Sequence, residues 1–92
     1  MLAIENMPFP LPTIVTQKNA LQLQKDGLLN SVNLRLIDCS ALKDFDSSVL
    51  TVLLAWQKKL MAEGQSISIE GAPEKLKVLA GVYGVAVLLG LQ

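Results

Sequence analysis

The spacing of apolar and polar residues predicts helices in three parts of the chain. The clearest spans residues 47–63, and Gly64 follows it at the position where helices commonly end. A second helix is predicted over 73–84, because Pro73 suits the first position of a helix. Its core-facing stripe has the spacing i, i+3, i+4 and i+7 and consists of Leu76, Leu79, Ala80 and Tyr83. Residues 17–29 form a third candidate, weakened near its end by Gly27.

Strand patterns lie between these helices. The β-branched run 13–16 and the polar-apolar alternation over 66–70 are typical of strands. The mostly apolar run 32–37 indicates a strand buried on both faces. We expect a short connection over 41–45 and either an edge strand or a short helix over 85–91. Strands alternating with helices predict an α/β sandwich, with helices packed on a mostly parallel or mixed sheet of about four to five strands.

The start of the chain differs from the rest. Pro8, Pro10 and Pro12 are unsuited to a helix or a central strand. Residues 1–12 also lack the basic start and apolar centre of a signal peptide. We therefore expect an extended lead-in over 1–12 and a single domain over 13–92.

Charge and composition narrow the functions that fit. The 92 residues include 8 Lys and Arg, 8 Asp and Glu, and no His. A chain without a surplus of cations is unsuited to nucleic acid, and without His it lacks the usual metal ligand and proton shuttle. Cys39, the single cysteine, has no His to activate it as a nucleophile and no partner for an internal disulfide. We expect no catalytic residue, metal or cofactor, and a reducing, cytoplasmic compartment.

Two further features have ordinary explanations. The longest uncharged stretch, 78–92, is too short to span a bilayer, which takes about 20 apolar residues. Asp38, Asp44 and Asp46 lack the Gly and Glu of a calcium loop and are typical of turns and helix caps.

The helix over 47–63 has more apolar residues than packing on one sheet requires. Its predicted sheet-facing stripe consists of Val49, Leu50, Leu53, Trp56, Leu60 and Met61. Off this stripe lie a row made of Ser47, Thr51, Leu54 and Lys58 and a flank made of Val52 and Ala55. Either the N-terminal segment or the last residues cover this excess, or it is a docking surface for a partner protein. Asp46, Ser47 and Ser48 also stand where capping residues belong, and capping alone could explain them.

Two short motifs around this helix resemble the core of STAS domains, the anti-sigma-factor-antagonist family. The first is Ile-Asp-Cys-Ser over 37–40, and the second is Phe-Asp-Ser-Ser-Val-Leu over 45–50. The order of the later elements also fits, so that the resemblance covers about residues 13 to 90. It implies a STAS-type sandwich that acts by binding another protein.

Within this family the chain is most similar to the cytoplasmic STAS subunits of Mla phospholipid transporters. The similar segments are Leu-Leu-Ala-Trp-Gln-Lys over 53–58 and Leu-Ala-Gly-Val-Tyr-Gly-Val over 79–85. The resemblance implies a non-enzymatic adaptor that binds and supports the ATPase of an ABC transporter maintaining outer-membrane lipid asymmetry. Such an adaptor reaches the inner membrane only through its partners. The partner-binding residues predicted on this basis are Asp46, Ser47, Ser48, Thr51, Leu54 and Lys58.

A second function stays open, that of an anti-sigma-factor antagonist. Ser47 matches the hydroxyl residue that is phosphorylated in that branch, and Asp46 matches the acidic residue before it. The partners would then be an anti-sigma factor and a serine kinase. Val49 stands where phosphorylated members usually have Gly, which argues against recognition by a kinase.

Overall fold

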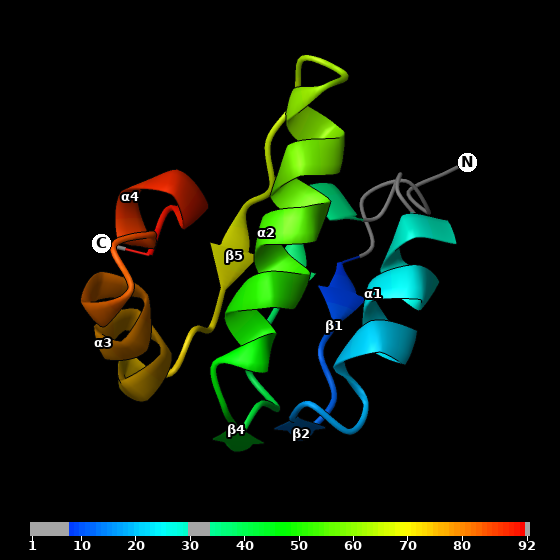
Figure 1. Cartoon of the computed structure of the whole chain (residues 1–92). Helices are drawn as coiled ribbons and strands as arrows, with labels where there is room; N and C mark the ends of the chain where they lie inside the picture. Colours follow the sequence, from blue (N-terminus) through cyan, green and yellow to red (C-terminus); the bar gives the residue numbers. More distant parts are fainter. Residues whose placement is uncertain (1–7, 30–33, 92) are drawn as a thin grey trace.

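Short parallel strands and four helices alternate along the part of the chain that the computed structural model describes, residues 8–29 and 34–91 (Figure 1). The elements, in chain order, are β1 (Phe9–Pro10), β2 (Ile14–Val15), α1 (Ala20–Leu29), β3 (Ile37–Asp38), β4 (Asp44–Phe45), α2 (Ser48–Met61), β5 (Ile69–Glu70), α3 (Glu74–Val82) and α4 (Ala86–Leu89). The predicted α/β class is confirmed. Of the two possibilities for 85–91, the structure shows the short helix.

The strands pair in parallel in two sheets, ordered β1-β3-β5 and β2-β4. The chain passes from β1 to β2 and from β3 to β4, so the second pair continues the first. Partners are 28 residues apart at Phe9 and Ile37 but 30 apart at Ile14 and Asp44. The connection from β3 to β4 is therefore two residues longer than the connection from β1 to β2.

The paired strands include two segments that were not predicted as strands. Phe9–Pro10 is extended, as expected for the lead-in, and is also an edge strand of the first sheet. Its neighbours hold it there, since the Phe9 and Leu11 N–H groups donate to the carbonyls of Leu36 and Asp38, and Pro10 has no N–H to leave unpaired at the open side. The division of the chain at residue 12 stays a prediction.

The expectation of a plain connection over 41–45 is wrong at β4. Its two residues, Asp44 and Phe45, pair with β2, and the short pairing replaces part of the expected loop. The predicted strand over 32–37 begins later, at Ile37, and its residues 32 and 33 lie outside the described part of the chain.

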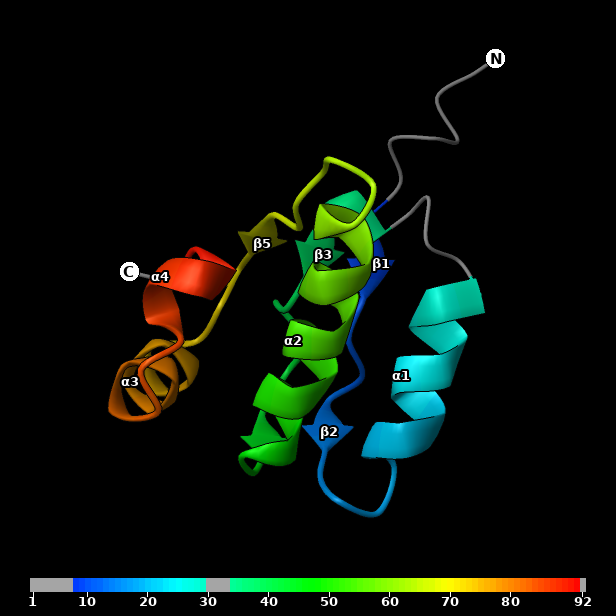
Figure 2. The ribbon, with the colours of Figure 1, turned by 45° about the horizontal axis from the view of Figure 1, so that its top comes forward.

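Helix α2 lies between α1 on one side and the pair α3 and α4 on the other, with the strands of the first sheet behind it (Figures 1 and 2). The fully buried side chains of α2 include Val49, Val52, Leu53 and Trp56. Gly64 adopts the left-handed conformation, with φ of 75°, just after α2, as its place in the sequence predicts.

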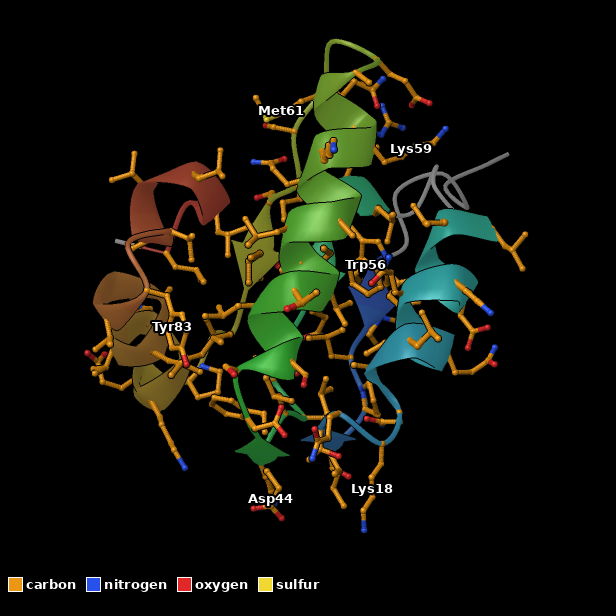
Figure 3. All side chains as sticks on the ribbon, viewed as in Figure 1. Lys18, Asp44, Trp56, Lys59, Met61 and Tyr83 are labelled. Carbon is orange, nitrogen blue, oxygen red and sulfur yellow. The ribbon has the colours of Figure 1, made fainter. Side chains whose placement is uncertain are left out.

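Trp56 joins α2 to α1 and to β1. Its indole N–H donates to the carbonyl oxygen of Gln24 at 3.1 Å, and its ring meets the ring of Phe9 edge-on at 5.2 Å between centroids. Gly27 lies directly against the indole, so that a Cβ there would overlap the ring atoms. Figure 3 shows Trp56 between the two helices. Gly27 is therefore a site of close helix approach, inside α1.

Two residues predicted to face the core do not. Met61 is 54% exposed because it lies in the final turn of α2, where a hollow separates this helix from α4. Tyr83 is 57% exposed although its N–H still donates to the Leu79 carbonyl at 3.1 Å, because it is the C-cap of α3 and no further turn of this helix follows it. Figure 3 labels both side chains.

Candidate functional site

The start of α2 is capped by Asp46. Its Oδ1 accepts the N–H of Ser48 at 2.8 Å, and its Oδ2 accepts the N–H of Gln17 at 3.2 Å. Ser47 has helical backbone angles and makes no side-chain capping bond. The aspartate therefore does the capping that the sequence assigned to all three polar residues, and the hydroxyl of Ser47 is not needed for it.

The same hydrogen bonds favour the ionised form of Asp46 at the start of α2. Those from the backbone and side chain of Ser48 are the main reason that the pKa of Asp46 lies below its ordinary value. Asp46 is thus ionised at neutral pH, and its negative charge lies at the positive end of the α2 dipole. Its bond to Gln17 also ties the start of α2 to the segment that leads into α1.

The structure places Ser47, Thr51, Leu54 and Lys58 along one side of α2, with Asp46 just before the helix and Ser48 in its first turn, toward the Val52 flank. We call this set the α2 face: Asp46, Ser47, Ser48, Thr51, Leu54 and Lys58. Asp46, Thr51 and Lys58 are exposed, whereas Ser47, Ser48 and Leu54 are half-buried. Leu54 packs partly on the hydrophobic core. The α2 face thus combines hydroxyl groups, one apolar side chain and charges at both ends.

Two neighbouring elements, α1 and α4, pack against α2 and cover part of its apolar excess. Val52 is completely buried and Ala55 is half-buried, and α1 packs along α2 as its main helical neighbour among the described elements. The expectation that the N-terminal segment covers the excess falls partly on residues 1–7, outside the described part of the chain. The last residues contribute through α4, which meets α2 at Gln57. Thr51 stays exposed between these coverings.

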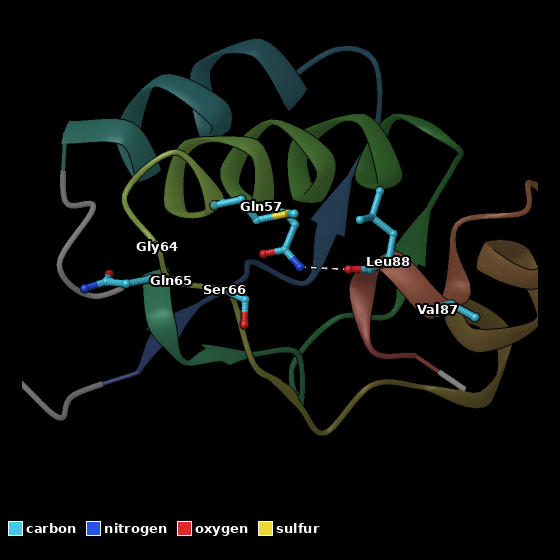
Figure 4. A pocket seen from close by; sticks show the side chains of 7 residues that line it. Gln57, Gly64, Gln65, Ser66, Val87 and Leu88 are labelled. Atoms are coloured by element: carbon cyan, nitrogen blue, oxygen red, sulfur yellow. Dashed lines mark hydrogen bonds between the residues drawn. The ribbon is translucent and has the colours of Figure 1, made fainter.

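Gln57 is a structural residue of this region that sequence reasoning missed. It is 6% exposed, its Nε2 donates to the Leu88 carbonyl at 2.7 Å, and its Oε1 accepts the N–H of Ile67 at 2.9 Å (Figure 4). One amide thus joins α2, α4 and the segment before β5. A signal was present, because Gln57 lies four residues after Leu53 and three before Leu60, on the inward side of the helix.

Two adjoining hollows lie beside Gln57. One, of about 340 Å³, is lined by Leu54, Gln57, Lys58, Met61 and Leu88. The other, of about 680 Å³, shares Gln57, Met61 and Leu88 with it and continues to Gly64, Gln65, Ser66 and Val87 (Figure 4). The hollows therefore continue the α2 face toward the end of the helix.

The remaining chemical candidates are turn and core residues. Burial is the main cause that raises the pKa of the Cys39 thiol to about 12, which keeps it protonated and inert. Asp38 accepts the N–H of Ser40 and thereby closes a turn. Within the described ranges no three His, Cys, Asp or Glu side chains are close enough to hold a metal ion, and no helix there is long and apolar enough to cross a membrane.

Comparison with known proteins bears directly on this arrangement. The family model described as "Mlab, STAS domain" matches residues 13–90, from the segment before β2 to the end of α4. No curated protein matches the chain. Parallel strands with helices packed on them agree with the STAS fold that the motifs around Asp38 and Asp46 suggested. The chain therefore belongs to the MlaB-type STAS domain family.

Proposed function

We propose that this protein is a non-enzymatic adaptor that binds the ATPase of an Mla-type phospholipid ABC transporter through the α2 face. The observation that carries the proposal is the open row on α2, where Thr51 is exposed while α1 packs against the helix on its Trp56 side. Membership of the MlaB-type family supports the choice of partner.

The composition of the α2 face suits contact with a protein. The side chains of Ser47 and Thr51 are short, so a partner helix or loop can approach the α2 backbone closely. Leu54 offers an apolar centre, whereas Asp46 and Lys58 offer opposite charges at the two ends of the row. An apolar centre with a polar rim is the usual organisation of a protein interface.

The adaptor would act by binding alone. It has no phosphate-binding Gly-x-x-x-x-Gly-Lys-Ser/Thr loop, so nucleotide chemistry would belong to its partner. It would support the ATPase by binding one conformational or assembly state more tightly than another, and its effect cannot exceed that difference in affinity. In this proposal the protein lies in the cytoplasm at the inner membrane, held there by the transporter that maintains outer-membrane lipid asymmetry.

Titration of the ATPase with variants of the α2 face tests the proposal. Ser47→Arg and Thr51→Arg place a long cation in the middle of the face and should weaken binding about tenfold or more. Val78→Arg makes a matched control, because Val78 is an exposed position of α3 outside the face, and its affinity should equal that of the wild type. Wild-type affinity in both α2 variants would contradict the proposed interface.

A phosphorylation switch at Ser47 is a second candidate, favoured by the fact that this hydroxyl is not used in capping. A phosphate there adds a charge of roughly −2 beside the ionised Asp46 and would repel an acidic or apolar partner. Incubation with an anti-sigma-factor serine kinase, followed by intact mass measurement, tests it. An unchanged mass would exclude the switch for that kinase, and a single phosphate mapped to Ser47 would favour it.

A further inference from the structure

The smaller hollow beside the α2 face is apolar and open to a ligand. Leu54 and Met61 line its α2 side and Leu88 its α4 side. Met61 and Leu88 are 54% and 47% exposed, so the side chains that line this hollow leave apolar surface uncovered. Its volume of about 340 Å³ lies near the lower end of the range of roughly 300–1,000 Å³ found for ligand pockets.

The polar group at this hollow is already satisfied. Both ends of the Gln57 amide are used, the nitrogen by the Leu88 carbonyl and the oxygen by the Ile67 N–H. The amide therefore has little left to offer a polar ligand, and it holds α4 against α2 so that the hollow keeps its shape. What the hollow offers is apolar contact.

Lys58 is the one charged residue among those that line this hollow. It is exposed, and within residues 8–29 and 34–91 it has no ion-pair partner. The next residue, Lys59, differs, because its Nζ lies 3.0 Å from the carboxylate of Glu63. The rim thus carries an uncompensated positive charge next to apolar walls.

We propose that the hollow receives a segment of the partner protein in which a large apolar side chain stands next to a carboxylate. The apolar side chain would enter between Leu54, Met61 and Leu88, and the carboxylate would pair with Lys58. This inference rests on the proposed function, because Leu54 and Lys58 belong both to the α2 face and to the hollow. A partner that covers the face therefore reaches the hollow, where charge complementarity selects an acidic segment.

Charge reversal at neighbouring lysines tests the electrostatic part. Lys58→Glu should weaken binding to the ATPase about tenfold or more and reduce the dependence of affinity on salt, because a matched pair becomes a repelling one. Lys59→Glu has the same change in charge one residue away, outside the hollow, and should change affinity less than about threefold. Equal affinities for Lys58→Glu and the wild type would overturn the inference.

A photoreactive residue in place of Met61 tests the apolar part. Cross-linked to the ATPase in the assembled complex and mapped by mass spectrometry, it should capture a segment with Asp or Glu within about one helical turn of the captured apolar residue. Capture of a segment without an acid, or of a second copy of this chain, would overturn the inference.

The two proposals can fail separately. Loss of binding in Ser47→Arg with full binding in Lys58→Glu would keep the α2 face and refute the acidic segment. Absence of binding by the wild-type protein would refute the adaptor function itself, and the inference with it.

Discussion

At Gly27, where α1 and α2 approach closely, we expect Gly27→Ala to lower the free energy of unfolding, the opposite of the usual effect of this substitution in a helix. At an open helical position, replacing Gly by Ala stabilises a protein by roughly 0.5–1 kcal/mol, because Ala loses less backbone freedom on folding. At Gly27 the added methyl would overlap the indole of Trp56. That ring cannot easily move, since it is fully buried, bonded to the Gln24 carbonyl and in contact with Phe9.

The cost of the methyl group should exceed its gain. Overpacking a core costs about 1–3 kcal/mol, and a ring held on several sides puts Gly27→Ala toward the upper end. After the gain in propensity, we expect the free energy of unfolding to fall by about 2 kcal/mol. Domains have about 0.05–0.15 kcal/mol of stability per residue, so the loss would be a large part of the total.

Urea unfolding, followed by far-ultraviolet circular dichroism, measures this difference. Gly81→Ala is the matched control, because Gly81 lies in α3 with open space around the new methyl, and this variant should gain up to about 1 kcal/mol. The two variants make the same chemical change, so opposite signs isolate the contact with Trp56. A Gly27→Ala protein at least as stable as the wild type, with an unchanged slope against urea, would refute the reasoning.

Three other changes have defined outcomes. Gln57→Leu leaves the Leu88 carbonyl and the Ile67 N–H without their partner and should lower the free energy of unfolding by about 1–3 kcal/mol in urea; an unchanged midpoint would show that the amide bonds add nothing. The thiol of Cys39, whose pKa burial raises to about 12, should not react with a thiol reagent at about pH 8.5, near the pKa of an unperturbed cysteine, until urea unfolds the protein. Rapid reaction of the native protein would contradict its burial. Hydrogen bonds from Ser48 lower the pKa of Asp46 in the folded protein, so the ionised carboxylate stabilises the fold above its unfolded pKa near 3.8, and this stabilisation is lost as the pH falls through the folded pKa. Asp46→Asn should therefore lose less thermal stability on acidification than the wild type. Parallel curves of melting temperature against pH for the two proteins would contradict this.

The parts of the fold that follow from local pattern were predictable. Helix α2 has a long apolar stripe and ends before Gly64, and both signals lie within one stretch of sequence. Strand β4 has neither length nor alternation, because it consists of two residues that are extended through pairing with β2. It exists because it pairs with β2, where Asp44 lies opposite Ile14, 30 residues earlier in the chain. No local pattern reveals such a pairing.

The candidate site divides in the same way. Helical spacing placed Ser47, Thr51, Leu54 and Lys58 in one row. The function of Gly27 could not be derived, because the reason for a glycine there is a tryptophan on another helix. Tyr83 follows the spacing of α3 but is its C-cap, and spacing alone does not show whether another element covers a residue at the end of a helix.

Strand β1 has a practical consequence for shortening the protein. The family match begins at residue 13, after β1. A chain cut there would lose the buried Leu11 and the ring of Phe9 that touches Trp56. It would also leave the carbonyls of Leu36 and Asp38 without their donors, so that β3 would change from a central strand to an exposed edge. Unpaired edges of this kind promote aggregation, so the shortened protein should associate with itself more readily than the full chain.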